Sequence, residues 1–65
     1  MDFSISGDIL RGVRQIALFI EEDQRATYYK LANGMLPGGK EGNGWVASKR
    51  VLREHYTRLT RDKAA

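Results

Sequence analysis

The sequence has no cysteine and only one proline, one tryptophan and one histidine among its 65 residues. Without cysteine the chain can form neither a disulfide nor a thiolate metal site. The single histidine, His55, has no evident carboxylate partner, and we expect it to be a half-buried helix residue rather than a ligand or a base. The sequence therefore predicts no enzyme, no catalytic residue, no metal site and no cofactor.

Long apolar runs are also missing. The longest, Ile16-Ala-Leu-Phe-Ile20, has five residues, whereas about 20 are needed to span a bilayer. The beginning of the chain, MDFSISGDI, lacks the basic start and the long apolar stretch of a signal peptide. We therefore expect no contact with a membrane and a cytoplasmic location.

The length predicts one small domain, because at this size folding buries only about 60% of the surface of the unfolded chain. The net charge of +3 is unevenly distributed. Residues 1–23 carry two basic and five acidic side chains, and residues 24–65 carry nine basic and three acidic ones. The later elements are thus expected to present a basic face, as in proteins that neutralise phosphates. The alternative is a merely solvated surface.

Two helices are predicted before residue 34. Apolar residues recur at intervals of three and four from Ile9 to Ile20, which predicts an amphipathic helix centred on residues 13–20. Asp8 is a candidate cap for an earlier turn. Asp23 is an N-cap for a second helix that ends at Asn33, before Gly34.

A glycine-rich segment, GMLPGGKEGNGW, follows the second helix and holds five of the seven glycines. We predict a β-hairpin with strands at residues 36–40 and 44–47 and with a turn at Asn43-Gly44, since both residues accept positive φ. Trp45 is expected to anchor the hairpin to the helices. A third helix capped by Ser48 follows, and its inward stripe is Val51, Leu52, Tyr56 and Leu59.

The same glycine-rich segment matches the opening of a phosphate-binding P-loop through Gly34, Gly39 and Lys40. A P-loop needs a strand before it, a helix after it and a hydroxyl beside the lysine. Here a helix precedes the segment, Asn43-Gly44 interrupts the following one, and Glu41 takes the place of the hydroxyl. The sequence therefore favours the hairpin over nucleotide binding.

The order of these features resembles the excisionase-like and MerR-like winged helix-turn-helix domains. Asp23 caps the second helix, Gly34-Met-Leu-Pro37 ends that helix, Gly42 and Trp45 lie in the wing, and the segment from Ser48 opens the last helix. The fold class expected is mainly α with a small β-hairpin. We expect an N-terminal extension at 1–8, the domain at 9–60 and a tail at 61–65.

The resemblance implies binding of double-stranded DNA, with the second helix in the major groove and the wing against the backbone or the minor groove. Family members of this size are commonly recombination directionality factors, which bend DNA cooperatively for excision. The partners implied are a tyrosine or serine integrase and further copies of the chain along DNA. The alternatives are a small transcriptional regulator and a terminase-like DNA-packaging or protein-interaction module.

The candidate DNA-binding residues come from three segments. In the second helix, Arg25 is expected to read guanine, Gln24 adenine or phosphate, and Tyr29 to face DNA. Tyr28 is expected in the core or at a phosphate. The remaining candidates are phosphate or minor-groove contacts: Lys30, Lys40, Asn43, Lys49 and Arg50.

Overall fold

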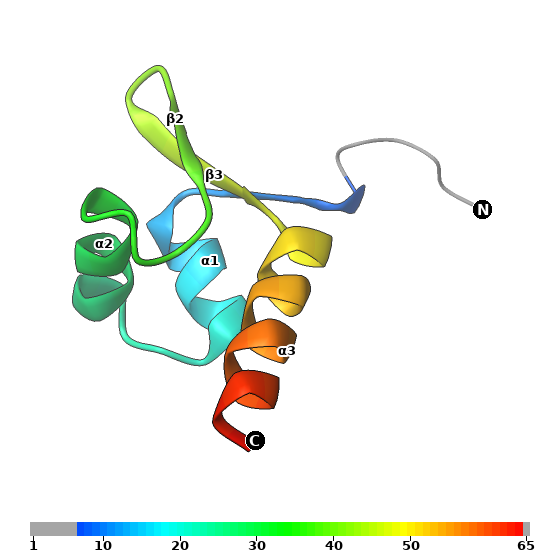
Figure 1. The fold of residues 1–65 in the computed structure, drawn as a ribbon. Helices are drawn as coiled ribbons and strands as arrows, with labels where there is room; N and C mark the ends of the chain where they lie inside the picture. The colour runs from blue at the N-terminus through cyan, green and yellow to red at the C-terminus, as the bar shows by residue number, and fades with distance from the viewer. Residues whose placement is uncertain (1–6, 65) are drawn as a thin grey trace.

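The computed structural model describes residues 7–64 and the side chains of residues 7–61. The elements follow in the order β1 (Ile9–Arg11), α1 (Val13–Ile20), α2 (Gln24–Ala32), β2 (Gly39–Glu41), β3 (Gly44–Ser48) and α3 (Lys49–Ala64). Over these residues the chain is a mixed α/β domain, in which three helices accompany a small antiparallel sheet (Figure 1). None of the described helices is long and apolar enough to cross a membrane.

The sheet contains a strand that the sequence analysis missed. β1 pairs antiparallel with β3 and gives the strand order β1-β3-β2. The assignment of Ile9 and Leu10 to a helical face is wrong, because Leu10 reaches the core from a strand. Gly12 separates strand from helix with φ 90° and ψ 149°, a conformation that only glycine adopts readily. Its amide then donates to the carbonyl of Trp45 at 2.7 Å.

The two predicted helices before residue 34 are confirmed. α1 covers the predicted residues 13–20, and its C-cap Glu21 takes a left-handed conformation. Asp23 caps α2 by accepting a hydrogen bond from the amide of Ala26 at 2.7 Å. Gly34 follows the C-cap Asn33, and the amide of Met35 donates back to the carbonyl of Lys30 at 2.8 Å. These bonds satisfy groups at both ends of α2.

The predicted hairpin is present, but its turn lies one residue earlier than expected. Glu41 pairs with Gly44, so the two turn residues are Gly42 and Asn43. Only Gly42 has a positive φ, of 65°. A positive φ at the first central residue alone is typical of a type II′ turn, which places Gly at that position. Gly44 is therefore the first residue of β3, and the expected positive φ at Asn43 and Gly44 is wrong.

α3 begins where Ser48 meets Asp8, the residue expected to cap an earlier turn. Ser48 accepts a hydrogen bond from the amide of Val51 at 3.2 Å, as predicted. Asp8 caps α3 rather than an early turn: its carboxylate accepts from the amide of Arg50 at 3.1 Å and from the hydroxyl of Ser48. Its carbonyl accepts from the amide of Lys49 at 2.8 Å. Two first-turn amides of α3, those of Lys49 and Arg50, are thus bound by Asp8, which lies more than 40 positions earlier in the chain.

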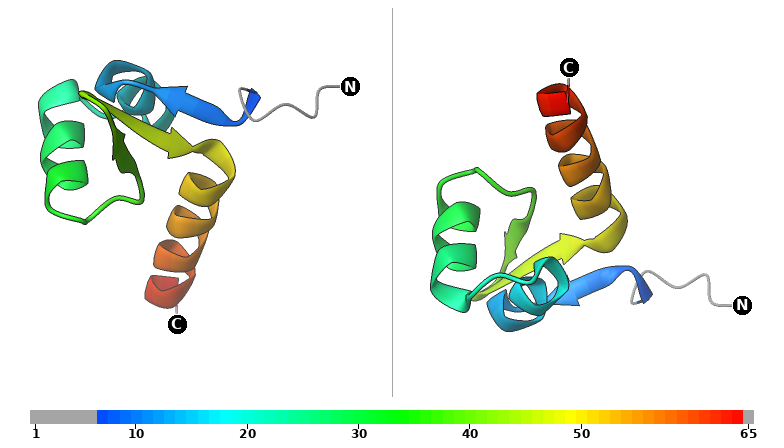
Figure 2. Two further views of the ribbon diagram at one scale, coloured as in Figure 1. Left: turned by 90° about the horizontal axis from the view of Figure 1, so that it is seen from above. Right: turned by 90° about the horizontal axis from the view of Figure 1, so that it is seen from below.

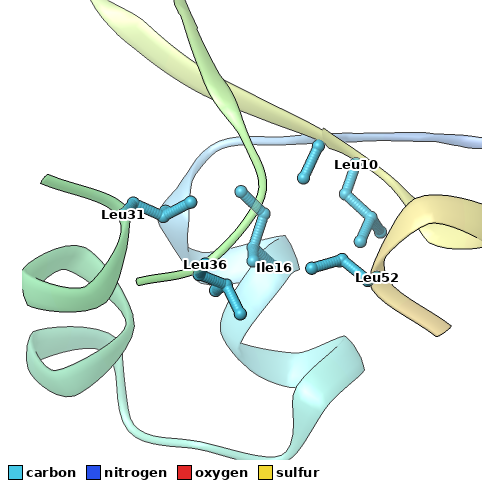
Figure 3. Packing of buried hydrophobic residues seen from close by; sticks show 6 residues of the cluster. Leu10, Ile16, Leu31, Leu36 and Leu52 are labelled. Carbon is cyan, nitrogen blue, oxygen red and sulfur yellow. The ribbon is translucent and has the colours of Figure 1, made fainter. Parts of the chain in front are cut away.

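One hydrophobic core joins the three helices with β1 and β3. Its buried members come from β1, α1, α2, the segment before β2, β3 and α3: Leu10, Ile16, Leu31, Leu36, Ala47 and Leu52. Figure 3 shows Leu31 and Leu52 pointing toward one another from opposite sides of Ile16. Leu59 does not join this core, because its side chain is 45% exposed, and its place in the predicted inward stripe is wrong. Beyond Tyr56, α3 continues past the packed body of the domain as far as Ala64.

Candidate nucleic-acid interface

The outward face of α2 carries four of the candidate residues. Thr27 and Leu31 turn inward and are fully buried. Because successive helical residues are rotated by about 100°, the residues on the opposite side of the helix face solvent. The exposed candidates on this helix are Gln24, Arg25, Tyr28 and Tyr29.

Both tyrosines of α2 are available to a partner. Tyr29 is 61% exposed, as expected for a surface residue. Tyr28 is 54% exposed and is therefore no core residue, which removes one of its two expected roles. Arg25 lies one helical turn before both rings, at the spacing that makes residues neighbours on a helix surface. A guanidinium and two phenols thus share one face.

Trp45 connects this face of α2 to the hairpin. Its ring meets Tyr28 edge to face, with centroids 6.5 Å apart and planes at 86°. Lys40, on β2 opposite Trp45, places its ammonium group 5.7 Å from the centre of the indole. Trp45 is half-buried and packs against the core, as predicted for an anchor. Tyr28, Trp45 and Lys40 therefore form a continuous strip across α2, β3 and β2.

The negative charge near the tip of the hairpin is neutralised by an ion pair. Glu41, which would repel phosphate, forms an ion pair with Arg11 of β1 at 2.9 Å. Both side chains are more than half exposed, so the pair contributes little to stability. It nevertheless places a positive group beside the carboxylate. Asn43 lies exposed in the turn, where its amide is accessible.

Lys30 is held away from the outward face of α2. Its ammonium group donates to a carboxylate oxygen of Glu22, and 30% of the side chain is exposed. This hydrogen bond raises the pKa of Lys30 above its ordinary value. A phosphate contact by Lys30 would require breaking the pair, so Lys30 is the candidate that the geometry supports least.

The two candidates at the beginning of α3 differ in their surroundings. Lys49 is half-buried, whereas Arg50 is exposed and pairs with Glu54 one turn later at 3.2 Å. Both follow the capping contact of Asp8. The hydrogen bond from Ser48, followed by that from the amide of Arg50, lowers the pKa of Asp8 below its ordinary value of 3.8. The carboxylate is therefore ionised and fixes the helix at neutral pH.

Three further arginines lie along α3 and were not counted among the candidates: Arg53, Arg58 and Arg61. All three are exposed. The guanidinium of Arg53 lies over the ring of Phe19 of α1, 5.4 Å from its centre. Their spacing with Arg50 would have identified a single basic helical face from the sequence alone.

The described residues provide no evident centre for other chemistry. They contain no group of three or more His, Cys, Asp or Glu side chains that could hold a metal ion. His55 is half-buried, as predicted, and meets Tyr56 edge to face with ring centres 5.1 Å apart. Around Lys40, α2 precedes the glycine-rich segment and a strand follows it. This order differs from that of a P-loop in both flanking elements.

Most of the candidate residues thus share one exposed surface formed by the outward face of α2 and the hairpin, hereafter the α2–hairpin surface: Gln24, Arg25, Tyr28, Tyr29, Lys40 and Asn43. Comparisons of the chain with protein-family models, with curated proteins and with solved structures gave no match.

Proposed function

We propose that the chain is a winged helix-turn-helix protein that binds double-stranded DNA in a sequence-specific manner. In this proposal α2 enters the major groove and the hairpin is the wing. The observation that carries it is the strip from Tyr28 through Trp45 to Lys40, which couples α2 to the hairpin one helical turn beyond Arg25. A helix and a hairpin held together in this way can contact a groove and the adjacent backbone at once.

The residues of the α2–hairpin surface divide into two roles. Arg25 and Gln24 carry side chains that can each form two hydrogen bonds with a base edge, guanine for arginine and adenine for glutamine. Tyr28 and Tyr29 add hydroxyl groups for phosphate oxygens. Lys40 supplies a point charge, which suits phosphate more than a base. Readout is thus assigned to α2 and positioning to the hairpin.

Within this class we propose an excisionase-like recombination directionality factor, which acts on DNA architecture for an integrase and catalyses no reaction itself. The resemblance of the sequence supports this narrower proposal. A single domain of this size covers little DNA, and several copies on repeated sites would give useful affinity. A transcriptional regulator would use the same surface.

The test is an electrophoretic mobility shift with DNA from the flanks of the native gene, at about 50 mM and about 200 mM salt. About four phosphate contacts would lower the affinity by about 100-fold between these conditions, because each contact releases counterions. A scrambled duplex of equal length is the control for specificity. Absence of any shift at the lower salt concentration would refute DNA binding and favour a protein-interaction module.

A further inference from the structure

α3 carries a second basic surface that the proposed function does not use. Its arginines at positions 50, 53, 58 and 61 lie within an arc of roughly 140° around the helix axis, centred opposite Leu52. We call this surface the arginine face of α3. At about 1.5 Å per residue it extends for about 16 Å along the helix.

The arginine face extends away from α2 except at Arg53, which lines a pocket together with Lys30 of α2. Leu52 of α3 and Leu31 of α2 point toward one another across the core (Figure 3), so the opposite faces of the two helices point apart. In both views of Figure 2, α2 lies at the left edge of the domain and α3 lies to the right, away from it. We therefore expect that one straight duplex seated on the outward face of α2 does not reach Arg58 and Arg61, at the far end of α3.

The composition of the arginine face suits a phosphate backbone. An open groove of about 330 Å³ runs between its side chains, and the other residues that line it are Glu54 and Thr57. Glu54 pairs with Arg50 and is the one carboxylate of the groove. No apolar residue lines it, whereas protein interfaces have an apolar core. The planar guanidinium group of arginine can donate two parallel hydrogen bonds to the oxygens of one phosphate.

We infer that the arginine face of α3 binds the phosphate backbone of a second DNA segment, so that one monomer bridges two duplexes. The inference rests on the proposed binding of DNA by the α2–hairpin surface. Contact through the arginine face is independent of base sequence, because every duplex presents the same phosphates. The protein would then join a specific site to any nearby segment of DNA.

A bridging assay tests the inference directly. One duplex with the target site is fixed to beads, and a second, fluorescent duplex of unrelated sequence is added with the protein. We expect the wild type to retain the fluorescent duplex on the beads. In the double variant Arg58→Gln/Arg61→Gln, retention should fall by at least about 10-fold, because two phosphate contacts are lost. Its affinity for the target duplex alone should change by less than about threefold.

A charge-conserving variant provides the matched control. Arg58→Lys/Arg61→Lys keeps both positive charges, and it should retain most of the bridging. If the lysine variant retains as little fluorescent duplex as the glutamine variant, the inference is contradicted. Circular dichroism should give the same helix content for all three proteins, because these side chains are exposed.

The outcomes separate the inference from the proposed function. A wild type that binds neither duplex refutes the proposed function, and the inference falls with it. If the wild type binds its target but retains no second duplex, the inference alone is refuted. An acidic protein segment would then be the expected partner of the arginine face. Light scattering without DNA measures whether the chain forms dimers. If the wild type is a dimer and the glutamine variant is a monomer, the arginine face binds a second copy of the chain, and the inference is overturned.

Discussion

The exposed faces of α2 and α3 are both basic, yet they are built from different side chains. The α2–hairpin surface combines one arginine with an amide and two phenols on α2, whereas the arginine face of α3 repeats a single cationic group. Mixed donors and acceptors can distinguish bases, because each base pair presents its own pattern in the major groove. Repeated arginine provides charge without such discrimination. The difference teaches that basic character alone does not assign a readout surface.

The largest expected effect comes from removing the core residue that fixes α3. Leu52→Ala should lower the free energy of unfolding by about 2–5 kcal/mol, since the side chain is completely buried and a cavity would remain. Both surfaces would be lost together. Urea denaturation followed by circular dichroism measures the change. Leu59→Ala, on the same helix but 45% exposed, should cost far less. Equal losses would contradict the packing described for α3.

Arg25→Ala should separate readout from positioning on the α2–hairpin surface. Loss of a bidentate hydrogen-bonded contact to guanine should reduce the discrimination between target and scrambled DNA by about 1–3 kcal/mol. Lys40→Ala should lower the affinity for the target and for the scrambled duplex to a similar degree, because it removes a phosphate contact. Competition binding with the two duplexes measures both effects. Equal loss of discrimination in the two variants would refute the assignment of readout to α2.

Gly38→Ala should show whether α2 and the hairpin act as one surface. A Cβ at this position would lie 2.7 Å from Cδ2 of Leu31 and 3.1 Å from the carbonyl oxygen of Val46. The crowding should lower the free energy of unfolding by about 1–3 kcal/mol and shift the hairpin relative to α2. Gly39→Ala is the matched control, since its Cβ would meet no atom within 4 Å. The melting temperature of Gly38→Ala should therefore be clearly lower than that of Gly39→Ala. Equal melting temperatures would contradict the close packing of Gly38 against Leu31 and Val46.

The smallest expected effect concerns the N-terminus of α3 and depends on pH. Because the pKa of Asp8 is lowered in the folded protein, its stabilisation is complete above its ordinary value of 3.8 and is lost as the pH falls below it. Asp8→Asn should therefore be slightly less stable than the wild type at about pH 7 and lose less stability between about pH 5 and about pH 2.5. Urea midpoints across this range measure the difference. Parallel pH profiles would contradict a charged cap at α3.

Much of the fold could be predicted because its determinants are local. Asp23 and Ser48 cap the residues that immediately follow them, and the apolar spacing of residues 13–20 defines α1. Gly34 ends α2 as predicted. The hairpin was expected from its glycines, although the turn lies at Gly42-Asn43 because the pairing of Glu41 with Gly44 decides the register. Such pairing depends on both strands together.

The candidate site was predicted less completely, because its geometry depends on contacts distant in sequence. Arg25 and Tyr29 face outward, as helical rotation indicated. Helical rotation did not reveal that Glu22 holds Lys30 or that Tyr28 meets Trp45. Likewise the ion pair that covers the charge of Glu41 joins residues 30 positions apart.

By itself the sequence determined the three helices, the caps Asp23 and Ser48 and the glycine-rich hairpin, because each depends on residues within a few positions of one another. Only the tertiary structure made Ile9–Arg11 a strand, since β3 supplies its hydrogen-bonding partners from 35 or more positions later in the chain. Only the tertiary structure brought Asp8 to the amides of α3 and set α2 and α3 on opposite sides of one core. Those contacts depend on how the chain closes, and no short segment encodes them.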